Sequence, residues 1–162
     1  MNYELKIEEI KRIKNAGKKI IFTNGVFDIL HKGHVDYLKE ASNFGDYLIV
    51  GINSDSSVKR LGKGDDRPIN NELDRAYIIE NLKSVSDTII FDEDTPLELI
   101  KKIVPDILVK GGDYDKDETD FNNKKYIVGS DIVLKNDGKV FTVDLTAGKS
   151  STNVIEKIKQ KG

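Results

Sequence analysis

The sequence predicts an α/β fold, a Rossmann-like doubly wound parallel sheet with helices on both faces. Stretches with helical periodicity alternate along the chain with short apolar stretches. These apolar stretches are continuous rather than alternating with polar residues, which is typical of parallel strands buried on both faces. The length of 162 residues suits a single domain, residues 1–162, with an N-terminal helix at about 3–16 and a core at about 17–158.

The first half of the chain contains two predicted helices and two predicted strands. Ile7, Ile10 and Ile13 recur at helical spacing, and Gly17 is expected to end this first helix. The apolar runs KIIFTNG and DYLIVGIN are predicted strands, and GHVDYLKEASNF between them is a predicted helix that starts at Gly33. The polar stretch SDSSVKRLGKGDDRPIN has no periodicity, so we expect a loop there.

The second half continues the alternation. NELDRAYIIENLK and TPLELIKKIV are predicted helices, the latter capped by Thr95 with Pro96 in its first position. DTIIF and DILVKGG are predicted strands. The segment SSTNVIEKIKQ is a predicted last helix with Ser150 or Ser151 as its N-cap.

The segment DIVLKNDGKVFTVD is compatible with two structures. It resembles a hairpin that turns at Asp137-Gly138, and it also fits a short helix that ends near Gly138 and leads into a parallel strand KVFTV. The sequence by itself slightly favours the hairpin.

Composition excludes several classes of protein. The chain has no cysteine, which excludes disulfides and thiolate metal sites. A formal net charge of -2 argues against a general nucleic-acid binder. No apolar run approaches the roughly 20 residues of a membrane span, and the charged N-terminus does not resemble a secretory signal. We therefore expect a cytoplasmic protein with no nucleic-acid or membrane partner.

Both histidines of the chain, His31 and His34, lie in the stretch GVFDILHKGH, just after the first predicted strand. Three interpretations are open. The histidines are ordinary packed or surface residues, or they form a metal pair that needs further carboxylate ligands, or they serve phosphate chemistry. The third interpretation explains most, because His34 falls in a helix first turn that attracts anions and Gly33 permits close approach of a phosphate.

Polar stretches follow three of the predicted strands: TNGVFDILHKGH, NSDSSVKRLGKGDDRP and KGGDY. In an open parallel sheet, ligands bind at the carboxyl ends of the strands. We therefore expect these three stretches to meet at one edge of the sheet and to form a binding site there.

The stretch TNGVFDILHKGH resembles the GxFDxxHxGH signature of the cytidylyltransferase-like nucleotidyltransferases. Six positions match, namely Gly25, Phe27, Asp28, His31, Gly33 and His34. The serine-threonine run that opens the last helix, in SSTNVI, is similar to the second signature of the family. The resemblance implies an HxGH nucleotidyltransferase fold. It also implies a short helix at about 129–136 and then a parallel strand, instead of the hairpin.

Longer segments resemble the branch of this family that transfers AMP from ATP to heptose 1-phosphate and releases ADP-heptose and pyrophosphate. These segments include GDYLIVGINSD, RPIN, EDTP, PDILVKGGDY and SSTNVIEKI. In bacteria this activity often accompanies a sugar kinase half, which we do not find, so the likeness is to a stand-alone form. Two alternatives are a cytidylyltransferase acting on glycerol 3-phosphate or a related small phosphate, and a non-catalytic nucleotide-binding domain.

The sequence departs from the family pattern at two places. Many members have an arginine where Ile155 stands, and cytidylyltransferases have Arg-Tyr-Val-Asp where this chain has KSVS, Lys83–Ser86. The second departure weakens a cytidine interpretation. The run AGKSST resembles a P-loop, but Val143 stands where that loop requires its first glycine.

The resemblance implies roles for particular residues. His31 and His34 would stabilise charge near the α-phosphate. The basic residues of the second polar stretch, apart from the resemblance, suggest Lys59 as a further catalytic contact. The nucleotide and its phosphates would contact a larger group: Thr23, Asn24, Gly25, Phe27, Gly33, Arg60, Lys110, Ser150, Ser151 and Thr152. The acceptor substrate would contact Asp28, Arg67, Gly111, Gly112 and Asp113.

Four basic residues, Lys59, Arg60, Lys63 and Arg67, lie in the predicted loop, where they are either solvated charges or part of a lid that closes over the triphosphate. Mg²⁺ is the expected cofactor, held mainly by substrate phosphates rather than by a protein metal site. The expected partners are ATP and a sugar 1-phosphate, and the resemblance also implies a homo-oligomer, a dimer or larger.

Overall fold

Five parallel strands form one sheet in the part of the chain that the computed structural model describes, residues 3–62, 64, 66–144, 148 and 150–160. The strands lie in the order β3-β2-β1-β4-β5. Their bounds are β1 (Ile20–Gly25), β2 (Tyr47–Asn53), β3 (Asp87–Phe91), β4 (Ile107–Gly111) and β5 (Lys139–Val143). The order reverses between β1 and β4. This arrangement confirms the predicted doubly wound parallel sheet.

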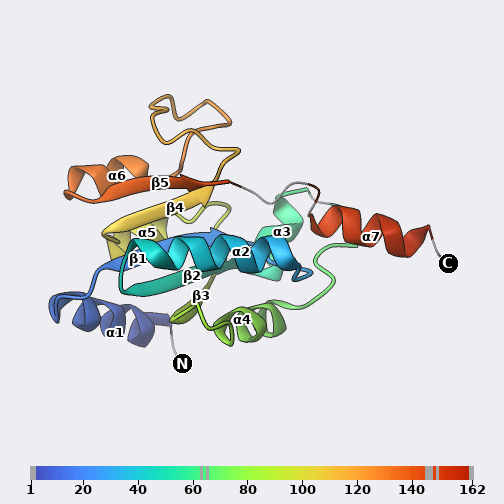
Figure 1. Ribbon diagram of the computed structural model, residues 1–162, viewed down its shortest axis with the longest axis horizontal. Helices are drawn as coiled ribbons and strands as arrows, with labels where there is room; N and C mark the ends of the chain where they lie inside the picture. The colour runs from blue at the N-terminus through green and yellow to red at the C-terminus, as the bar shows by residue number, and fades with distance from the viewer. Residues whose placement is uncertain (1–2, 63, 65, 145–147, 149, 161–162) are drawn as a thin grey trace.

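Helices cover both faces of this sheet, as predicted. One face packs against α1 (Tyr3–Asn15), α5 (Leu97–Ile103) and α6 (Ser130–Lys135), and the other against α2 (Lys32–Ala41) and α4 (Glu72–Glu80). The remaining helices are the 3₁₀ turn η1 (Ser42–Phe44), α3 (Asp55–Arg60) and α7 (Ser151–Lys159). Figure 1 shows α2 in front of the sheet, α5 behind it, and α7 beyond the carboxyl ends of the strands.

Alternate residues of the strands supply two hydrophobic cores. Ile20 and Phe22 of β1 point into the core beneath α1 and α5, whereas Ile21 points into the core beneath α2 and α4. All three side chains are fully buried. Burial of one such side chain stabilises the fold by about 1.5–3 kcal/mol. The well-packed strands therefore fix the positions of the polar residues at their carboxyl ends.

The hairpin prediction for residues 131–144 is wrong, and the family-based expectation is confirmed. Residues Ser130–Lys135 form α6, and β5 pairs with β4 in parallel, with Val109 opposite Phe141. Asp137 adopts a left-handed φ of 60°, and the Gly138 N–H bonds to the Val133 carbonyl at 2.9 Å. Residues with a left-handed conformation end helices and also form hairpin turns. The sequence Asp137-Gly138 is therefore compatible with both structures.

Two local predictions also need correction. The segment predicted as a loop contains the short helix α3, because the Ser54 hydroxyl accepts a hydrogen bond from the Ser57 N–H and caps it. Pro96 is the N-cap of α5 rather than its first residue, so Thr95 lies one position outside the helix. Among the described residues, no helix has the length and apolar character required to cross a membrane.

Candidate active site

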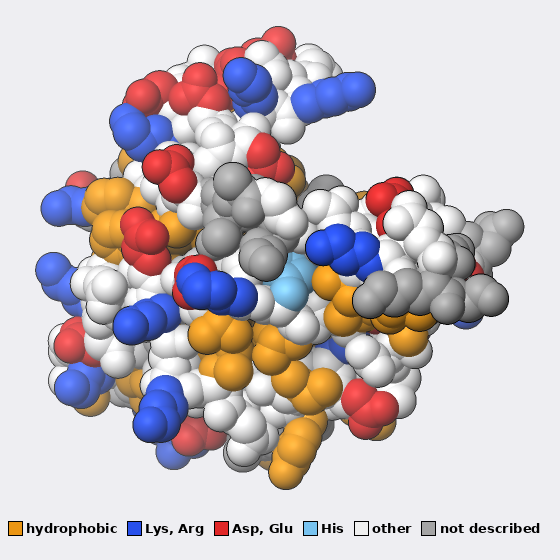
Figure 2. Space-filling view, turned by 45° about the vertical axis from the view of Figure 1, so that its right-hand side comes forward, with side chains coloured by type: hydrophobic (Ala, Val, Ile, Leu, Met, Phe, Trp, Pro, Cys, Tyr) orange, Lys and Arg blue, Asp and Glu red, His pale blue; other side chains and the backbone are white. Residues whose placement is uncertain are grey.

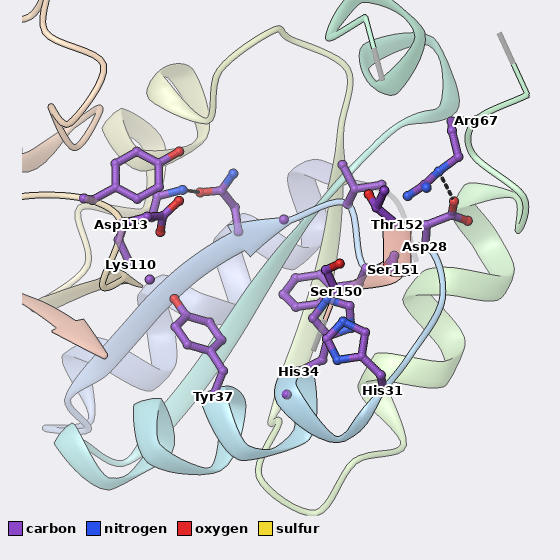
Figure 3. Close-up of a pocket in the computed structure, with 17 residues that line it drawn as sticks. Asp28, His31, His34, Tyr37, Arg67, Lys110, Asp113, Ser150, Ser151 and Thr152 are labelled. Atoms are coloured by element: carbon purple, nitrogen blue, oxygen red, sulfur yellow. Dashed lines mark hydrogen bonds and ion pairs between the residues drawn. The ribbon is translucent and has the colours of Figure 1, made fainter. Parts of the chain in front are cut away.

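A cavity of about 570 Å³ opens at the carboxyl ends of β1 and β4, where the strand order reverses. Ligands of open α/β sheets bind at this point. Figure 3 shows His31, His34 and Ser150 to Thr152 on one side of the cavity and Lys110 with Asp113 on the opposite side. Figure 2 shows histidine surface exposed near the centre of this face, so the cavity is open to solvent.

The two histidines stand side by side at the start of α2. His31 is the N-cap in an extended conformation, and His34 lies in the first turn. Their rings stack with centroids 3.8 Å apart and planes 18° apart. Gly33 lies between them, is buried and lines the cavity. An anion placed here meets both imidazoles, the free N–H groups of the helix and the positive end of its dipole.

Phe27 supports the histidine pair from the side. Its ring meets the His34 ring edge-on, with 5.1 Å between centroids. Phe27 adopts a left-handed φ of 49°, which is uncommon for a bulky residue. A Cβ atom at Gly25 would lie 2.9 Å from the Phe27 ring, so this turn requires a glycine at position 25. The Gly-x-Phe part of the signature is therefore a packing unit.

Asp28 fastens the segment that precedes α4. Its buried carboxylate accepts hydrogen bonds from the backbone N–H groups of Ile69 at 2.8 Å and Asn70 at 2.9 Å. One carboxylate oxygen lies 2.7 Å from the Arg67 Nε atom, and Arg67 lines the cavity. Asp28 therefore holds Arg67 at the edge of the site.

Arg75 of α4 is a second anchor, and the sequence-based predictions missed it. Its side chain is fully buried and donates to the Val26 carbonyl at 2.7 Å, the Asn70 carbonyl at 2.9 Å and the Asp55 carboxylate at 2.7 Å. These partners belong to three different segments around the histidine loop. A signal existed in the sequence, because Arg75 precedes the apolar Ile79 by four residues and so shares its helix face.

Lys110 is the penultimate residue of β4 and lies on the opposite side of the cavity. Its ammonium donates to the Asn24 side-chain carbonyl at the end of β1 and lies 5.3 Å from the centre of the Tyr114 ring. Burial lowers the pKa of Lys110 to about 8, and the nearby Asp113 carboxylate opposes this shift. A buried ammonium group is stabilised by a nearby anion, so the part of the cavity around Lys110 favours a phosphate group.

The N-terminus of α7 lines the cavity on the same side as the histidines. Ser150 is its N-cap and accepts from the Asn153 N–H at 3.0 Å, as predicted for one of the two serines. The Ser151 hydroxyl donates to the Ile29 carbonyl at 3.2 Å, which ties α7 to the histidine loop. Thr152 also lines the cavity.

Most of the predicted site residues line this single cavity. They are Asn24, Gly25, Phe27, Asp28, His31, Gly33, His34, Arg67, Lys110, Gly111, Asp113, Ser150, Ser151 and Thr152. Thr23 lies beneath the floor instead, where its hydroxyl and the Tyr37 hydroxyl share a hydrogen bond of 2.7 Å. Tyr37 and Tyr114 line the cavity and were missed, although Tyr37 follows His34 by three residues on the same helix face.

Besides Thr23, three predicted contacts lie outside the cavity lining. Lys59 is exposed on α3, and Arg60 at its end pairs with Asp94. Because α3 forms where a loop was expected, these two residues lie on a helix and do not fold over the cavity. Gly112 donates its N–H to the Val143 carbonyl at 2.8 Å and so extends the pairing of β4 with β5. Lys63 lies outside the described residues.

Protein ligands for a resident metal ion do not cluster in this site. Within residues 3–62, 64, 66–144, 148 and 150–160, no three His, Asp or Glu side chains gather in a way that would hold one. Asp28 is occupied by Arg67 and two backbone N–H groups, which leaves Asp113 as a carboxylate on the cavity surface.

A doubly wound sheet with a histidine pair at its switch point, beside the N-terminus of a second helix, defines a Rossmann-like domain with a site that favours phosphate groups. The sequence profile of the cytidylyltransferase-like family matches residues 22–157. The chain therefore belongs to the cytidylyltransferase-like family, as the signature in TNGVFDILHKGH indicated.

Similar proteins include two bacterial relatives, each named bifunctional protein HldE. The one from a Nitratiruptor species is 54% identical over 149 residues, which cover 92% of this chain and 29% of the relative. The one from Aliarcobacter butzleri is 52% identical over 157 residues, which cover 94% of this chain and 30% of the relative. The chain thus spans just under a third of the length of these relatives.

A solved structure shares the fold. It is the lipopolysaccharide core biosynthesis protein from Thermoplasma volcanium, with a TM-score of 0.61 and 32% sequence identity. The match covers 80% of this chain and 98% of that one.

Proposed function

We propose that this domain is a nucleotidyltransferase that transfers AMP from ATP to a heptose 1-phosphate, giving ADP-heptose and pyrophosphate. The observation that carries the proposal is the stacked pair His31 and His34 at the N-terminus of α2, with Ser150–Thr152 on the same side of one cavity. The heptose branch is supported by the resemblance of PDILVKGGDY and SSTNVIEKI, and by relatives named HldE and a lipopolysaccharide core biosynthesis protein.

In the proposed reaction, a phosphate oxygen of the sugar 1-phosphate attacks the α-phosphorus of ATP. A new P–O bond forms there, the bond to the α–β bridging oxygen breaks, and pyrophosphate leaves in line with the attack. The attacking phosphate is already ionised at neutral pH, so no side chain needs to remove a proton. The domain contributes positioning and charge neutralisation.

The residues of the cavity divide this work. His31 and His34 stabilise the charge that builds up around the α-phosphate, and Gly33 lets it approach the backbone. Ser151 and Thr152, at the start of α7, hold the departing pyrophosphate. Arg67, held by Asp28, adds a cation at the edge of the site. Contacts of Lys59 and Arg60 with the triphosphate stay predictions, because neither residue lines the cavity.

Mg²⁺ fits this site as a companion of the triphosphate. Mg²⁺ usually binds through one or two carboxylates together with substrate phosphates, and Asp113 offers one carboxylate on the cavity surface. When bound, the ion would neutralise charge on the phosphates. The cytoplasmic location, the homo-oligomer and the stand-alone single domain stay predictions from the sequence.

The proposal is tested by measuring pyrophosphate release for each pairing of ATP or CTP with heptose 1-phosphate, glycerol 3-phosphate or ethanolamine phosphate. The proposal predicts release with ATP and heptose 1-phosphate. Preference for CTP with glycerol 3-phosphate would assign the chain to the cytidylyltransferase alternative. Tight ATP binding without release across the panel would make it a non-catalytic nucleotide-binding domain.

A further inference from the structure

Lys110 is a buried lysine in the wall between two cavities. It exposes only 9% of its surface, and it lines both the main cavity of about 570 Å³ and a neighbouring cavity of about 220 Å³. Its ammonium donates to the Asn24 side-chain carbonyl and lies 5.3 Å from the centre of the Tyr114 ring. Neither partner is an anion, and in the part of the chain that the structure describes Lys110 forms no ion pair. The amine is therefore open to chemistry from either cavity.

We infer that Lys110 is a modification site, where its side-chain amine is acylated by small acyl phosphates such as acetyl phosphate. The donor lies across the shared wall, with its phosphate in the main cavity, its short acyl group in the smaller cavity and its carbonyl carbon beside Lys110. This inference goes beyond the proposed function, because it assigns to the domain a covalent reaction of its own side chain and a way of losing a cation from the site.

The two cavities differ in the same way as the two ends of such a donor. The main cavity contains the start of α2 with both histidines, which favours a phosphate group. Besides its polar groups, the smaller cavity has an apolar part that suits a methyl or short alkyl group, formed by Val26, Leu61, Pro96 and Val128. At about 30 Å³ for each water of the liquid, its volume equals about seven waters, so the acyl chain must be short.

Acylation requires the neutral amine, and the environment of Lys110 favours that form. Burial lowers the pKa of Lys110 to about 8, while the Asp113 carboxylate opposes this shift. Tyr37 and Tyr114, which line the same cavity, stay neutral because burial raises the pKa of each phenol. Asp94 is the carboxylate in the lining of the smaller cavity.

The lowered pKa sets the size of the expected effect. At about pH 7.5, roughly a quarter of Lys110 side chains are uncharged, against about one in a thousand for an ordinary lysine. A lower pKa also weakens a nucleophile, but by a smaller factor, as measured for thiols. Lys110 should therefore react roughly tenfold faster than an exposed lysine.

The reaction balances without a further reactant. The lone pair of the Lys110 Nζ atom attacks the carbonyl carbon of the acyl phosphate, and a C–N bond forms. The bond from that carbon to the bridging oxygen breaks, and phosphate leaves with the electron pair. The amine releases one proton to solvent, so the products are an uncharged amide and inorganic phosphate. The cation that attracts phosphate at this end of the cavity is then lost.

The test incubates the wild-type chain with acetyl phosphate and follows the acetylation of each lysine by mass spectrometry of its peptides. At about pH 7.5, Lys110 should be acetylated roughly tenfold faster than Lys139. Lys139 is the internal control, because it is an exposed lysine at the start of β5 outside both cavities. Pyrophosphate competes for the main cavity, so it should slow acetylation of Lys110 and leave that of Lys139 unchanged. N-acetylimidazole, a donor without phosphate, should favour Lys110 less strongly.

Equal rates at Lys110 and Lys139, or no protection by pyrophosphate, would overturn the modification site. A preference for Lys110 that is as large with N-acetylimidazole would overturn the role of acyl phosphates. In the AMP-transfer assay, activity should fall in step with the acetylated fraction of Lys110, and the activity that Lys110→Arg retains should not respond to acetyl phosphate. Acetylation is measured without turnover, so a chain that releases no pyrophosphate from its substrates overturns the proposed function alone.

Discussion

The imidazole rings of His31 and His34 stack with their centroids 3.8 Å apart. One residue caps α2 and the other lies in its first turn, so the backbone of the helix start holds both rings on the same side of the cavity. This arrangement places two imidazole side chains beside the N-terminus of a helix, where an anion is favoured. The proposed AMP transfer takes place at this position.

Replacing His34 by alanine should lower kcat by about 100- to 1,000-fold, which is the usual cost of removing one donor to a transition-state oxyanion. The fold should persist, because His34 is only partly buried and α2 keeps its core residues Tyr37, Leu38 and Ala41. Pyrophosphate release measures the loss. Val35→Ala, at the next position of the same helix, is the control and should retain activity. Near-normal turnover in His34→Ala would contradict the assignment.

Activity should depend on the charge of Lys110. Burial lowers its pKa to about 8, so the ammonium that attracts phosphate is present below that pH and is lost as the pH rises through it. A profile of kcat/KM against pH, which reports groups of the free enzyme, should therefore fall above about pH 8.

Two variants isolate this effect. Lys110→Arg should remove the alkaline fall in kcat/KM, because a guanidinium stays protonated. Lys110→Met has no cation at this position, so its kcat/KM should be low at every pH. Lys139→Arg, an exposed position of β5, should keep the wild-type profile. An alkaline fall that persists unchanged in Lys110→Arg would show that another group titrates.

Arg75 should contribute strongly to stability. Replacement by leucine leaves the Val26 and Asn70 carbonyls and the Asp55 carboxylate without their donor. Removing one partner from a buried charged network costs about 3–5 kcal/mol, to be measured as the free energy of unfolding in urea. Arg12→Leu, on the exposed side of α1, should change it by about 0.5 kcal/mol or less. Equal effects of the two substitutions would refute the anchoring role.

Gly138 should tolerate no side chain. A Cβ atom there would lie 2.6 Å from the Val133 Cγ1 atom and 2.8 Å from the Asp106 carbonyl oxygen. Because two of the three nearest contacts are with backbone carbonyl oxygens, those of Asp106 and Val133, Gly138→Ala should lower the free energy of unfolding by about 1–3 kcal/mol. The comparison is Lys135→Ala, an exposed position of α6. A neutral Gly138→Ala would show that the turn between α6 and β5 can relax.

Periodicity and turn residues were sufficient to predict the sheet, because its strands are apolar runs and its helices carry clear stop signals, as at Gly17 with its φ of 88°. They were not sufficient between α6 and β5. Asp137-Gly138 serves a hairpin or a helix end equally well, and the choice is made by packing of Val133 and Val140 in one core, which no local pattern contains.

In the candidate site too, local sequence patterns predicted some residues, and contacts between distant segments place the others. The signature located the histidines, Gly33 and the serines of α7, because each sits at a strand end or a helix start. Lys59 and Arg60 were expected over the cavity, but α3 turns them toward solvent and Asp94. The roles of Arg75 and Tyr37 depend on contacts between segments distant in sequence, for example 49 positions between Arg75 and Val26.

The most direct test of AMP transfer at the histidine pair is ³¹P NMR of the chain incubated with ATP, Mg²⁺ and heptose 1-phosphate. Attack at the α-phosphorus predicts pyrophosphate together with a sugar-linked diphosphate, both growing at the same rate as ATP declines. His34→Ala should suppress both signals together. ADP together with a sugar bisphosphate would mean transfer of the γ-phosphate instead, and would contradict AMP transfer.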